Sequence, residues 1–364
     1  MTEWTEYALE DLLSYEQPTP YIVESTDYSD NYKTPVLTAG KSFIIGYTNE
    51  TNGIYDKLPV IIFDDFTTST QYVNFPFKVK SSAMKILTAN TALVLPKFIF
   101  YRMQIIEFDH STHKRYWIQQ YSKIKVKIPS LPEQEKIVAK IEELFSELDN
   151  GVETLKKTKQ QLVVYRQAVL KEAFEGCLTE QWRKRNNCPN SWKIESITNL
   201  IQAGKHSLKA GPFGSALKKE CYVPSGYKIY GQEQVIGGNE EIGDYYISEG
   251  KYQELITCKI APKDVLISLV GTIGKVLVLS DNCKEGIINP RLIKISLDQE
   301  KMLPTFFKYY FESDYFRSLY KEKAHGATMD VLNMGMIKEL PFKWCPIDEQ
   351  KEVISEIEAR MTIL

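Results

Sequence analysis

The feature that most constrains the fold of this 364-residue chain is a sequence repeat at long range. The stretch Leu131-Pro-Glu-Gln-Glu-Lys-Ile-Val-Ala-Lys-Ile141 returns as Ile347-Asp-Glu-Gln-Lys-Glu-Val-Ile-Ser-Glu-Ile357, so that Glu133-Gln134 and Glu349-Gln350 match at one constant offset. A repeat at this long range is the signature of a structural unit that occurs more than once in a chain.

Two further echoes keep the same order along the chain. Trp4, Leu9, Leu12 and Leu13 correspond to Trp192, Ile197, Leu200 and Ile201 at a somewhat smaller offset. Leu95-Pro-Lys-Phe98 corresponds to Leu303-Pro-Thr-Phe306 at an intermediate one. Since the offset grows along the chain, an internal duplication with small insertions explains all three echoes. It predicts the order globular domain, helix, globular domain, helix.

The segment after Pro132 is predicted to be one long helix. A proline at the first helical position sacrifices no hydrogen bond, and Glu133 and Glu135 favour the positive end of the helix dipole. No proline follows until well beyond Lys171, and one glycine, Gly151, interrupts the segment. About 40 residues at ~1.5 Å each give a rod of roughly 60 Å.

The apolar residues of this helix alternate at spacings of four and three, which is the pattern of a coiled-coil seam. The predicted helix-pairing seam consists of Ile137, Ile141, Leu144, Leu148, Leu155, Leu162 and Val169. A rod of this length buries a single stripe only against another helix, so we expect a partner helix. The second copy starts in the same way after Pro346, but only its first turns are present before Leu364. We expect the rest of that rod to be trimmed from this chain or supplied by another one.

The predicted fold class is α+β, with two similar mixed α/β domains, a long coiled-coil helix between them and a truncated second helix. We assign residues 1–130 and 186–345 to the two domains, 131–185 to the helical spacer and 346–364 to the start of a second spacer. Strands are expected at Val60–Phe63, Val265–Ser268 and Lys275–Leu279, and one helix over Phe306–Phe316.

Composition indicates a globular protein without a membrane segment or a metal site. The chain is 43% hydrophobic and 25% charged, and its six cysteines form no Cys-x-x-Cys pair. No apolar run approaches the ~20 residues needed to span a bilayer, and the acidic stretch Met1–Leu13 lacks the apolar core of a signal peptide. We therefore expect reduced thiols, no bound metal and a cytoplasmic location.

The candidate motifs of catalysis all fail on their spacing or residue types. Gly271-Thr-Ile-Gly-Lys-Val276 has too few residues between its glycines for a phosphate-binding loop and lacks the final hydroxyl. Asn74-Phe-Pro-Phe77 departs from the amino-methyltransferase motif at its first proline, and Asp64-Asp65 favours a turn at the end of a strand over a metal site. The histidines show no ligand spacing. We expect a chain that is not an enzyme and holds no cofactor.

Local clusters of cations, hydroxyls and amides indicate contact with DNA, although 45 basic against 47 acidic residues make the chain nearly neutral. The candidates of the first domain are Thr67, Thr68, Ser69, Thr70, Lys78, Lys80, His113, Lys114 and Arg115. Those of the second are Lys205, Lys209, Ser215, Lys218, Lys219, Gln232, Gln234, Asn289 and Arg291, of which the last four are of types that read base edges. The alternative is a coiled-coil scaffold for protein assembly without a DNA role, which the near-neutral charge favours.

The whole layout, with Leu131-Pro-Glu-Gln opening the rod, resembles the specificity subunit of type I restriction-modification enzymes. Further matching pieces lie in the second domain: Gly211-Pro-Phe-Gly-Ser215, Gly271-Thr-Ile-Gly-Lys275 and Ile288-Asn-Pro-Arg291. In the first domain, Pro59-Val-Ile-Ile-Phe-Asp-Asp65 and Lys80-Ser-Ser-Ala-Met84 look like one subclass of these recognition domains.

The resemblance implies two target recognition domains, each reading one half of a split site in double-stranded DNA. It also implies two partner methyltransferase subunits that flip and methylate an adenine at N6, and motor-nuclease subunits that cleave DNA with ATP. S-adenosylmethionine, ATP and Mg²⁺ would belong to those subunits. At ~3.4 Å per base pair, a rod of roughly 60 Å limits the separation of the half-sites to roughly 18 base pairs.

Overall fold

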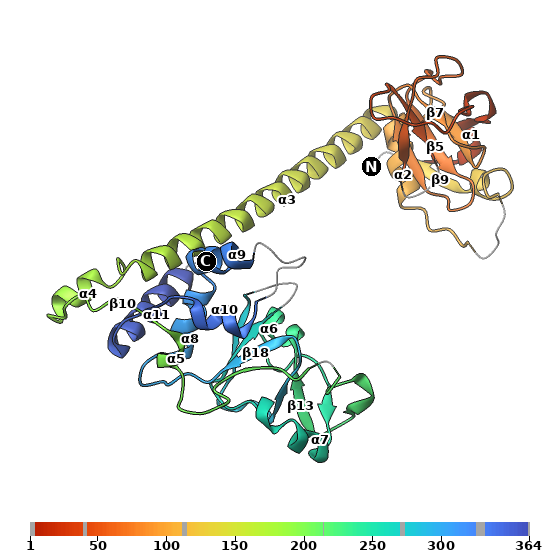
Figure 1. The fold of residues 1–364 in the computed structure, drawn as a ribbon. Helices are drawn as coiled ribbons and strands as arrows, with labels where there is room; N and C mark the ends of the chain where they lie inside the picture. Colours follow the sequence, from red (N-terminus) through yellow and green to blue (C-terminus); the bar gives the residue numbers. More distant parts are fainter. Residues whose placement is uncertain are drawn as a thin grey trace. The chain divides into compact units, whose positions relative to one another are not determined.

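The computed structural model describes residues 4–38, 42–110, 115–213, 215–269, 274–324 and 332–362. The chain divides into two compact units, Met1–Thr154 and Leu155–Leu364. The helix α3, Leu131–Phe174, belongs in part to each of them (Figure 1). The predicted α+β class, with a long helix between two sheet-containing parts of the chain, is confirmed. The predicted boundaries, which treat the helix as a spacer of its own, remain a prediction.

The first unit is built from one four-stranded, one three-stranded and one two-stranded sheet among its described residues. The strand orders are β2-β8-β5-β6, β4-β3-β7 and β1-β9. Helix α2, Pro96–Gln104, packs on the four-stranded sheet, and α1 is a single turn at Leu9–Leu12. The strands are β1 Thr5–Ala8, β2 Leu13–Glu16, β3 Thr34–Leu37, β4 Ile44–Thr48, β5 Val60–Asp64, β6 Thr70–Val73, β7 Lys78–Val79, β8 Met84–Ala89 and β9 Lys125–Ile128.

The second unit repeats this arrangement. Its sheets have the orders β11-β18-β15-β16, β12-β14-β13-β17 and β10-β19, so the first and last match the first unit strand for strand. The strands are β10 Lys193–Glu195, β11 Leu208–Ala210, β12 Tyr222–Val223, β13 Tyr227–Tyr230, β14 Tyr246–Ile247, β15 Val265–Ser268, β16 Val276–Val278, β17 Gly286–Ile288, β18 Leu292–Ile295 and β19 Phe342–Trp344. In the middle sheet β12 is an added edge strand, while β3–β7 and β13–β17 are both parallel pairs.

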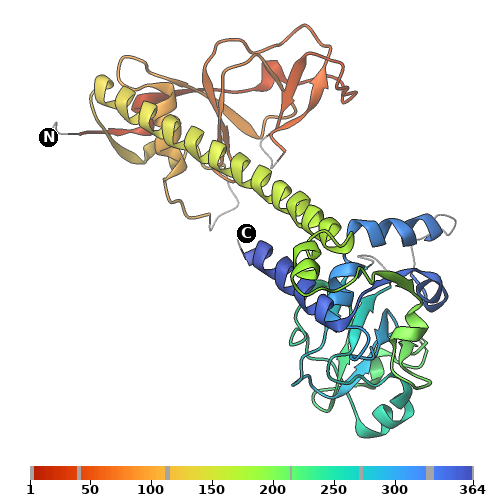
Figure 2. The same cartoon turned by 90° about the vertical axis from the view of Figure 1, so that its left-hand side faces the viewer.

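The helices of the second unit surround this repeated core (Figures 1 and 2). Figure 2 shows α11 beside the last turns of α3, where Arg360 lies 3.5 Å from Glu172. Both helices contribute to one apolar cluster, α3 through Val169 and Phe174 and α11 through Val353. The helices are α4 Glu180–Arg185, α5 Ile197–Leu200, α6 Gln232–Gly237, α7 Glu249–Glu254, α8 Pro304–Phe311, α9 Asp314–Ala324, α10 Met334–Glu339 and α11 Ile347–Thr362.

The strand register supports the internal duplication at single-residue precision. In the two-stranded sheet of the first unit, Thr5 pairs with Ile128. In that of the second unit, Lys193 pairs with Trp344. Thr5 and Lys193 are related by the same offset as the tryptophan echo of the sequence, and Ile128 and Trp344 by the same offset as the Glu-Gln echo. The two pairs of strands are therefore equivalent residue by residue.

A buried glutamine attaches α3 to the first unit. The Gln134 side chain is fully buried, and its Oε1 accepts the N–H of Leu95 at 2.8 Å. Its Nε2 donates to the carbonyl oxygens of Leu93 at 3.0 Å and Pro129 at 2.9 Å. One side chain therefore satisfies the N-terminus of α2, the loop before it and the strand that leads into α3.

Gln350 makes the same three hydrogen bonds in the second unit. Its Oε1 accepts the N–H of Leu303 at 2.9 Å, and its Nε2 donates to the carbonyls of Lys301 and Cys345, each at 2.8 Å. Leu303 and Lys301 are the counterparts of Leu95 and Leu93 in the Leu-Pro echo, and Cys345 is the counterpart of Pro129 in the Glu-Gln echo. The Glu-Gln echo thus marks a recurring joint between a helix and a globular unit.

One expectation about helices is wrong and another is confirmed. The helix expected over Phe306–Phe316 is two helices, because Glu312 ends α8 and the Ser313 hydroxyl accepts the N–H of Phe316 at 3.2 Å in the first turn of α9. The single long helix expected after Pro132 is confirmed, and α3 is continuous through Gly151. A side chain at this position would meet no atom within 4 Å, so the glycine is tolerated without any packing role.

We predict that Gln134→Ala and Gln350→Ala each destabilise their own unit by about 2 kcal/mol or more, because three buried hydrogen bonds to the backbone are lost in each variant. Hydrogen exchange followed by mass spectrometry would localise the loss to α2 in the first variant and α8 in the second. The control is Gln253→Ala, at an exposed position of α7. Equal protection in all four proteins would contradict the joint.

Candidate nucleic-acid interface

Three of the candidate residues, Thr67, Thr68 and Ser69, lie in the turn between β5 and β6, and a fourth, Thr70, begins β6. The Asp64 carboxylate organises this turn: it accepts the N–H of Phe66 at 2.9 Å and the hydroxyl of Thr67 at 2.7 Å. Thr68 adopts a positive φ of 57° at the tip. Thr67 and Ser69 are exposed, whereas Thr70 is buried and accepts a hydrogen bond from Gln104. Asp64 therefore shapes a turn, as the sequence predicts, and Thr70 faces inward.

The segment around His110 lies against the same turn. The His110 ring nitrogen Nε2 is 2.9 Å from both the Thr68 hydroxyl and the carbonyl oxygen of Thr67. The candidates His113 and Lys114 lie outside the described residues, whereas Arg115 is described and exposed. Just beyond Arg115, the buried carboxylate of Asp65 holds the chain by accepting the N–H of Trp117 at 2.8 Å.

Lys78 does not belong to a DNA-facing surface, which corrects the sequence interpretation. Its side chain is buried, forms an ion pair with Glu50, and donates to the carbonyl of Asn52 at 2.7 Å. The hydrogen bond that Lys78 donates to the Glu50 carboxylate, and one from the Ser25 N–H, hold the pKa of Glu50 below its ordinary value of 4.5. Lys80, two residues on, is exposed. The pairing with Glu50 turns one lysine inward, while the next is left in solvent just past the end of the short strand β7.

The second unit brings four of the candidates together around one groove of about 640 Å³. Lys219, Gln232, Asn289 and Arg291 line it, although they come from segments that lie far apart in the sequence. The remaining lining residues are Leu217, Tyr222, Ile229, Gly231, Glu233, Tyr245 and Pro290. The groove contains two cations and two amides, which are groups that hydrogen-bond to base edges. It also contains the pair Tyr222 and Tyr245, whose ring centroids are 5.4 Å apart and whose flat faces are of the kind on which bases stack.

Gln234 is not part of this groove, which is a second correction. Its side chain is fully buried; Oε1 accepts the N–H of Gly231 at 2.7 Å and Nε2 donates to the carbonyl of Ile242 at 2.6 Å. Gln234 therefore closes the first turn of α6 and the loop after it. Residues 232 and 234 face opposite environments because two positions on a helix are about 200° apart.

The glycine-rich loop lies directly beside the groove. A Cβ at Gly211 would stand 1.8 Å from the carbonyl oxygen of Asn289, so only glycine permits this close approach. Phe213 is 89% exposed at the described end of the loop. Ser215, Lys218 and Lys205 are exposed as well, and Lys209 on β11 is half-buried.

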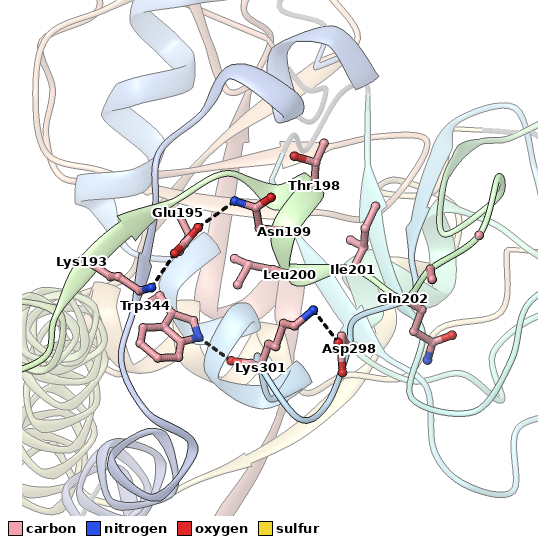
Figure 3. Close-up of a pocket in the computed structure, with 12 residues that line it drawn as sticks. Lys193, Glu195, Thr198, Asn199, Leu200, Ile201, Gln202, Asp298, Lys301 and Trp344 are labelled. Carbon is pink, nitrogen blue, oxygen red and sulfur yellow. Dashed lines mark hydrogen bonds and ion pairs between the residues drawn. The ribbon is translucent and has the colours of Figure 1, made fainter.

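A larger cavity of about 830 Å³, shown in Figure 3, has a different character. Its charged residues are paired within the wall: Lys193 with Glu195 at 2.8 Å, and Lys301 with Asp298 at 2.9 Å. Trp344 also donates its Nε1–H to the carbonyl of Lys301 at 2.7 Å. A wall whose charges satisfy one another offers little to a charged ligand, and it lacks the paired arginine and glutamine of the smaller groove.

The predicted helix-pairing seam divides into covered ends and an exposed middle. Ile137 packs on the apolar cluster of the first unit, and Val169 is buried in that of the second. Ile141 and Leu162 are half-buried, whereas Leu144, Leu148 and Leu155 are 50%, 60% and 71% exposed. Phe145, Val152, Val163 and Val164 add exposed apolar surface that the seam pattern did not include.

The comparisons with known proteins agree on one family. A family described as "Type I restriction modification DNA specificity domain" matches residues 1–162. The chain is 49% identical over 152 residues to the Escherichia coli type I restriction enzyme EcoR124I/EcoR124II specificity subunit, covering 40% of this chain and 37% of the relative. It is 25% identical over 244 residues to the EcoKI specificity subunit of Escherichia coli K12, covering 65% and 50%.

Residues 1–162 therefore belong to the type I restriction-modification DNA specificity domain family.

Solved structures show the same fold over nearly the whole chain. A chain from a study of complex assembly and conformational transition of the type I R-M system has a TM-score of 0.68 at 14% identity, covering 99% of this chain and 90% of that one. The HsdS subunit from Thermoanaerobacter tengcongensis has a TM-score of 0.60 at 14% identity, with the same coverage. The match spans 37% of the length of the EcoR124I/EcoR124II specificity subunit, 50% of the EcoKI subunit and 58% of the StySPI subunit of Salmonella potsdam. The chain therefore spans about half the length of these curated relatives.

Two structural findings bear on the expectations about membrane segments and metal sites. Among the described residues, no helix is long and apolar enough to cross a membrane. Within the same residues, no group of three or more histidine, cysteine, aspartate or glutamate side chains is arranged to hold a metal ion.

The groove contains residues that reasoning from the sequence missed. Tyr222 and Tyr245 occur among many tyrosines, and nothing in their local sequence separates them from core residues. Phe213, which does not line the groove but lies in the loop beside it, did carry a signal, because an aromatic residue between glycines in a Gly-Pro-Phe-Gly loop has few neighbours to bury it. The sequence interpretation treated that loop only as a place of close backbone approach.

We predict that Lys78→Met lowers the unfolding free energy of the first unit by about 1–3 kcal/mol without a sequence-selective loss of DNA affinity, because a largely buried carboxylate loses its cation. The pKa of Glu50 is depressed in the folded state, so this contribution is present above its ordinary pKa of 4.5 and is lost as the pH falls. Urea unfolding at neutral pH and at about pH 3 would measure it.

The matched control is Lys80→Met, at an exposed position two residues away. Its unfolding free energy should stay within about 0.5 kcal/mol of the unmodified protein. A gap between the Lys78 variant and the unmodified protein that stays constant down to low pH would speak against the Glu50 pair as its source.

Proposed function

We propose that this chain is the sequence-reading subunit of a type I restriction-modification complex and carries out no bond chemistry itself. Each of its two units reads one half of a bipartite site in double-stranded DNA. The observation that carries the proposal is the duplicated fold: both units share strand order and register, and each combines a shaped loop surface with hydroxyl, amide or guanidinium groups. A duplicated reader is suited to a site made of two half-sites.

The chemistry is assigned to partner subunits. Two methyltransferase subunits would take the target adenine out of the helix and methylate it at N6 with S-adenosylmethionine. Motor-nuclease subunits would use ATP and Mg²⁺ for translocation and cleavage. This division of labour also accounts for the formal net charge of −2, because partner chains share the phosphate contacts. The complex would work in the cytoplasm, where DNA and these cofactors are present.

The sharpest test of this function is the methylome. Cells that carry the complete system are compared with cells lacking only this gene, by sequencing that detects N6-methyladenine. We expect one bipartite methylated motif that disappears with the gene and returns on complementation. A methylome that does not change would refute the function and favour the scaffold alternative, which predicts no sequence-dependent shift of duplex DNA at moderate salt.

The exposed middle of α3 is proposed as the helix-pairing surface. Leu148 and Leu155 lie one above the other at a heptad spacing and are more than half exposed. An apolar stripe of this kind gains about 1.5–3 kcal/mol for each leucine that a partner helix covers. Paired in this way, the helices would hold the two units at a fixed separation and so set the spacing of the half-sites.

We predict that the double variant Leu148→Gln and Leu155→Gln weakens association of the full chain at least about 10-fold, because two covered leucines together contribute several kcal/mol. Sedimentation velocity over a range of protein concentrations would measure it. The control replaces Lys156 and Lys159, exposed on the same helix, by glutamine. Association that is equally strong in both variants would show that the stripe is not the pairing surface.

A further inference from the structure

A chain of hydrogen bonds links an exposed arginine of the groove to the buried sheet of the second unit. Ser268, the last residue of β15, is fully buried, and its hydroxyl accepts a hydrogen bond from Gln232 Nε2 at 2.9 Å. Gln232 Oε1 in turn accepts one from Arg291 Nη1 at 3.4 Å. The exposed guanidinium is therefore oriented by groups whose own positions are fixed by the sheet.

The backbone of Arg291 is fixed as firmly as its side chain. Its N–H donates to Asn289 Oδ1 at 2.9 Å, and its carbonyl accepts the N–H of Leu269 at 3.0 Å. The Asn289 N–H donates to the carbonyl of Tyr230 at 2.8 Å. Strand β18 begins at Leu292, directly after Arg291. A free arginine loses about 2 kcal/mol of rotamer entropy when it is held in one geometry. The hydrogen bond to Gln232 removes part of that loss before any ligand binds.

The electrostatics of the groove favour base edges over the phosphate backbone. Lys219 and Arg291 line it, but so does the exposed carboxylate of Glu233. A phosphate would be repelled by that carboxylate, whereas a base edge presents both donors and acceptors. Guanine is the base whose N7 and O6 match the two parallel N–H groups of a guanidinium.

We propose that Arg291 reads a guanine in the half-site of the second unit, and that Gln232 is the positioning residue that aims it. The proposal rests on the proposed function, and it deepens that function by naming the base and the side chain that selects it. Gln232, whose amide oxygen and nitrogen are both engaged with protein groups, then serves the specificity without contacting the base itself.

The test uses the full chain co-purified with its modification subunits. The recognised motif is first obtained from the methylome of the unmodified system. Fluorescence anisotropy then measures affinity for duplexes in which each base pair of the second half-site is replaced in turn. Arg291→Gln is the main variant, Gln232→Ala tests positioning, and Lys218→Gln is the control, since it removes an exposed cation of the same unit.

For the unmodified protein we expect one G·C position whose replacement by A·T weakens binding by about 10- to 100-fold. In Arg291→Gln that discrimination falls to within about 2-fold or reverses toward adenine, which a glutamine pairs with bidentately. All other positions keep their discrimination. Gln232→Ala reduces discrimination at the same position without changing the preferred base. Lys218→Gln changes affinity for every duplex by one common factor and flattens the salt dependence.

Different failures have different meanings in this design. If Arg291→Gln weakens binding to every duplex equally, as the lysine control does, Arg291 contacts phosphate and the inference is wrong while the proposed function stands. If discrimination is unchanged at every position, the inference is equally wrong. If the unmodified complex binds all duplexes alike, the proposed function itself fails. Melting temperatures within a few degrees of the unmodified protein would confirm that each variant is folded.

Discussion

The architecture depends on the hydrogen bonds made by one fully buried glutamine side chain in each unit, Gln134 in the first and Gln350 in the second. Each glutamine hydrogen-bonds to the N–H at a helix N-terminus, a loop carbonyl and the carbonyl that follows a strand, and buried backbone groups of this kind need such partners. Because a glutamine offers one acceptor and two donors in a single plane, few other residues can replace it. The joint therefore fixes the angle at which each helix leaves its globular unit. This role also accounts for the glutamine of the repeated dipeptides Glu133-Gln134 and Glu349-Gln350, the clearest trace of the duplication in the sequence.

The elements that were predictable are those whose cause is local. The periodicity after Pro132 identified α3, and the Val60 and Val265 segments are strands because short apolar runs bounded by turn residues rarely become anything else. The joint of α8 and α9 was missed, since a serine cap inside an apolar run is outweighed by the run itself. Lys78 and Gln234 were misassigned for a different reason: the burial of Lys78 depends on Glu50, 28 residues away, and that of Gln234 on how the loop after α6 folds back to place the Ile242 carbonyl beside it. Which polar residue is buried follows from tertiary contacts, and a single sequence does not contain them.

The base reading proposed for the groove of the second unit would reconcile sequence specificity with a nearly neutral chain. Most nonspecific affinity for DNA comes from phosphate contacts, which require many cations, whereas discrimination between bases requires few groups held in fixed positions. Arg291 and Asn289 are held by the close approach of Gly211 to the Asn289 carbonyl and by the amide of Gln232. Preorganisation of this kind requires that the loop lose conformational freedom on folding, but it does not require additional positive charge. The specificity of such a unit can accordingly change through one or two side chains at the groove while the sheets beneath remain as they are.

The candidate surface of the first unit is built in a different way. Its turn after β5 is held from below by Asp64 and from the side by His110, while buried Asp65 lies 3.3 Å from Lys85 and accepts the N–H of Trp117. Hydroxyls of Thr67 and Thr68 occupied by these contacts are less available as base readers than their exposure suggests, so the turn presents mainly a shape and its backbone. Two copies of one fold thus differ where insertions have accumulated between shared strands. If each copy reads its own half-site, this divergence in the loops is what allows a duplicated domain to recognise two different sequences with one scaffold.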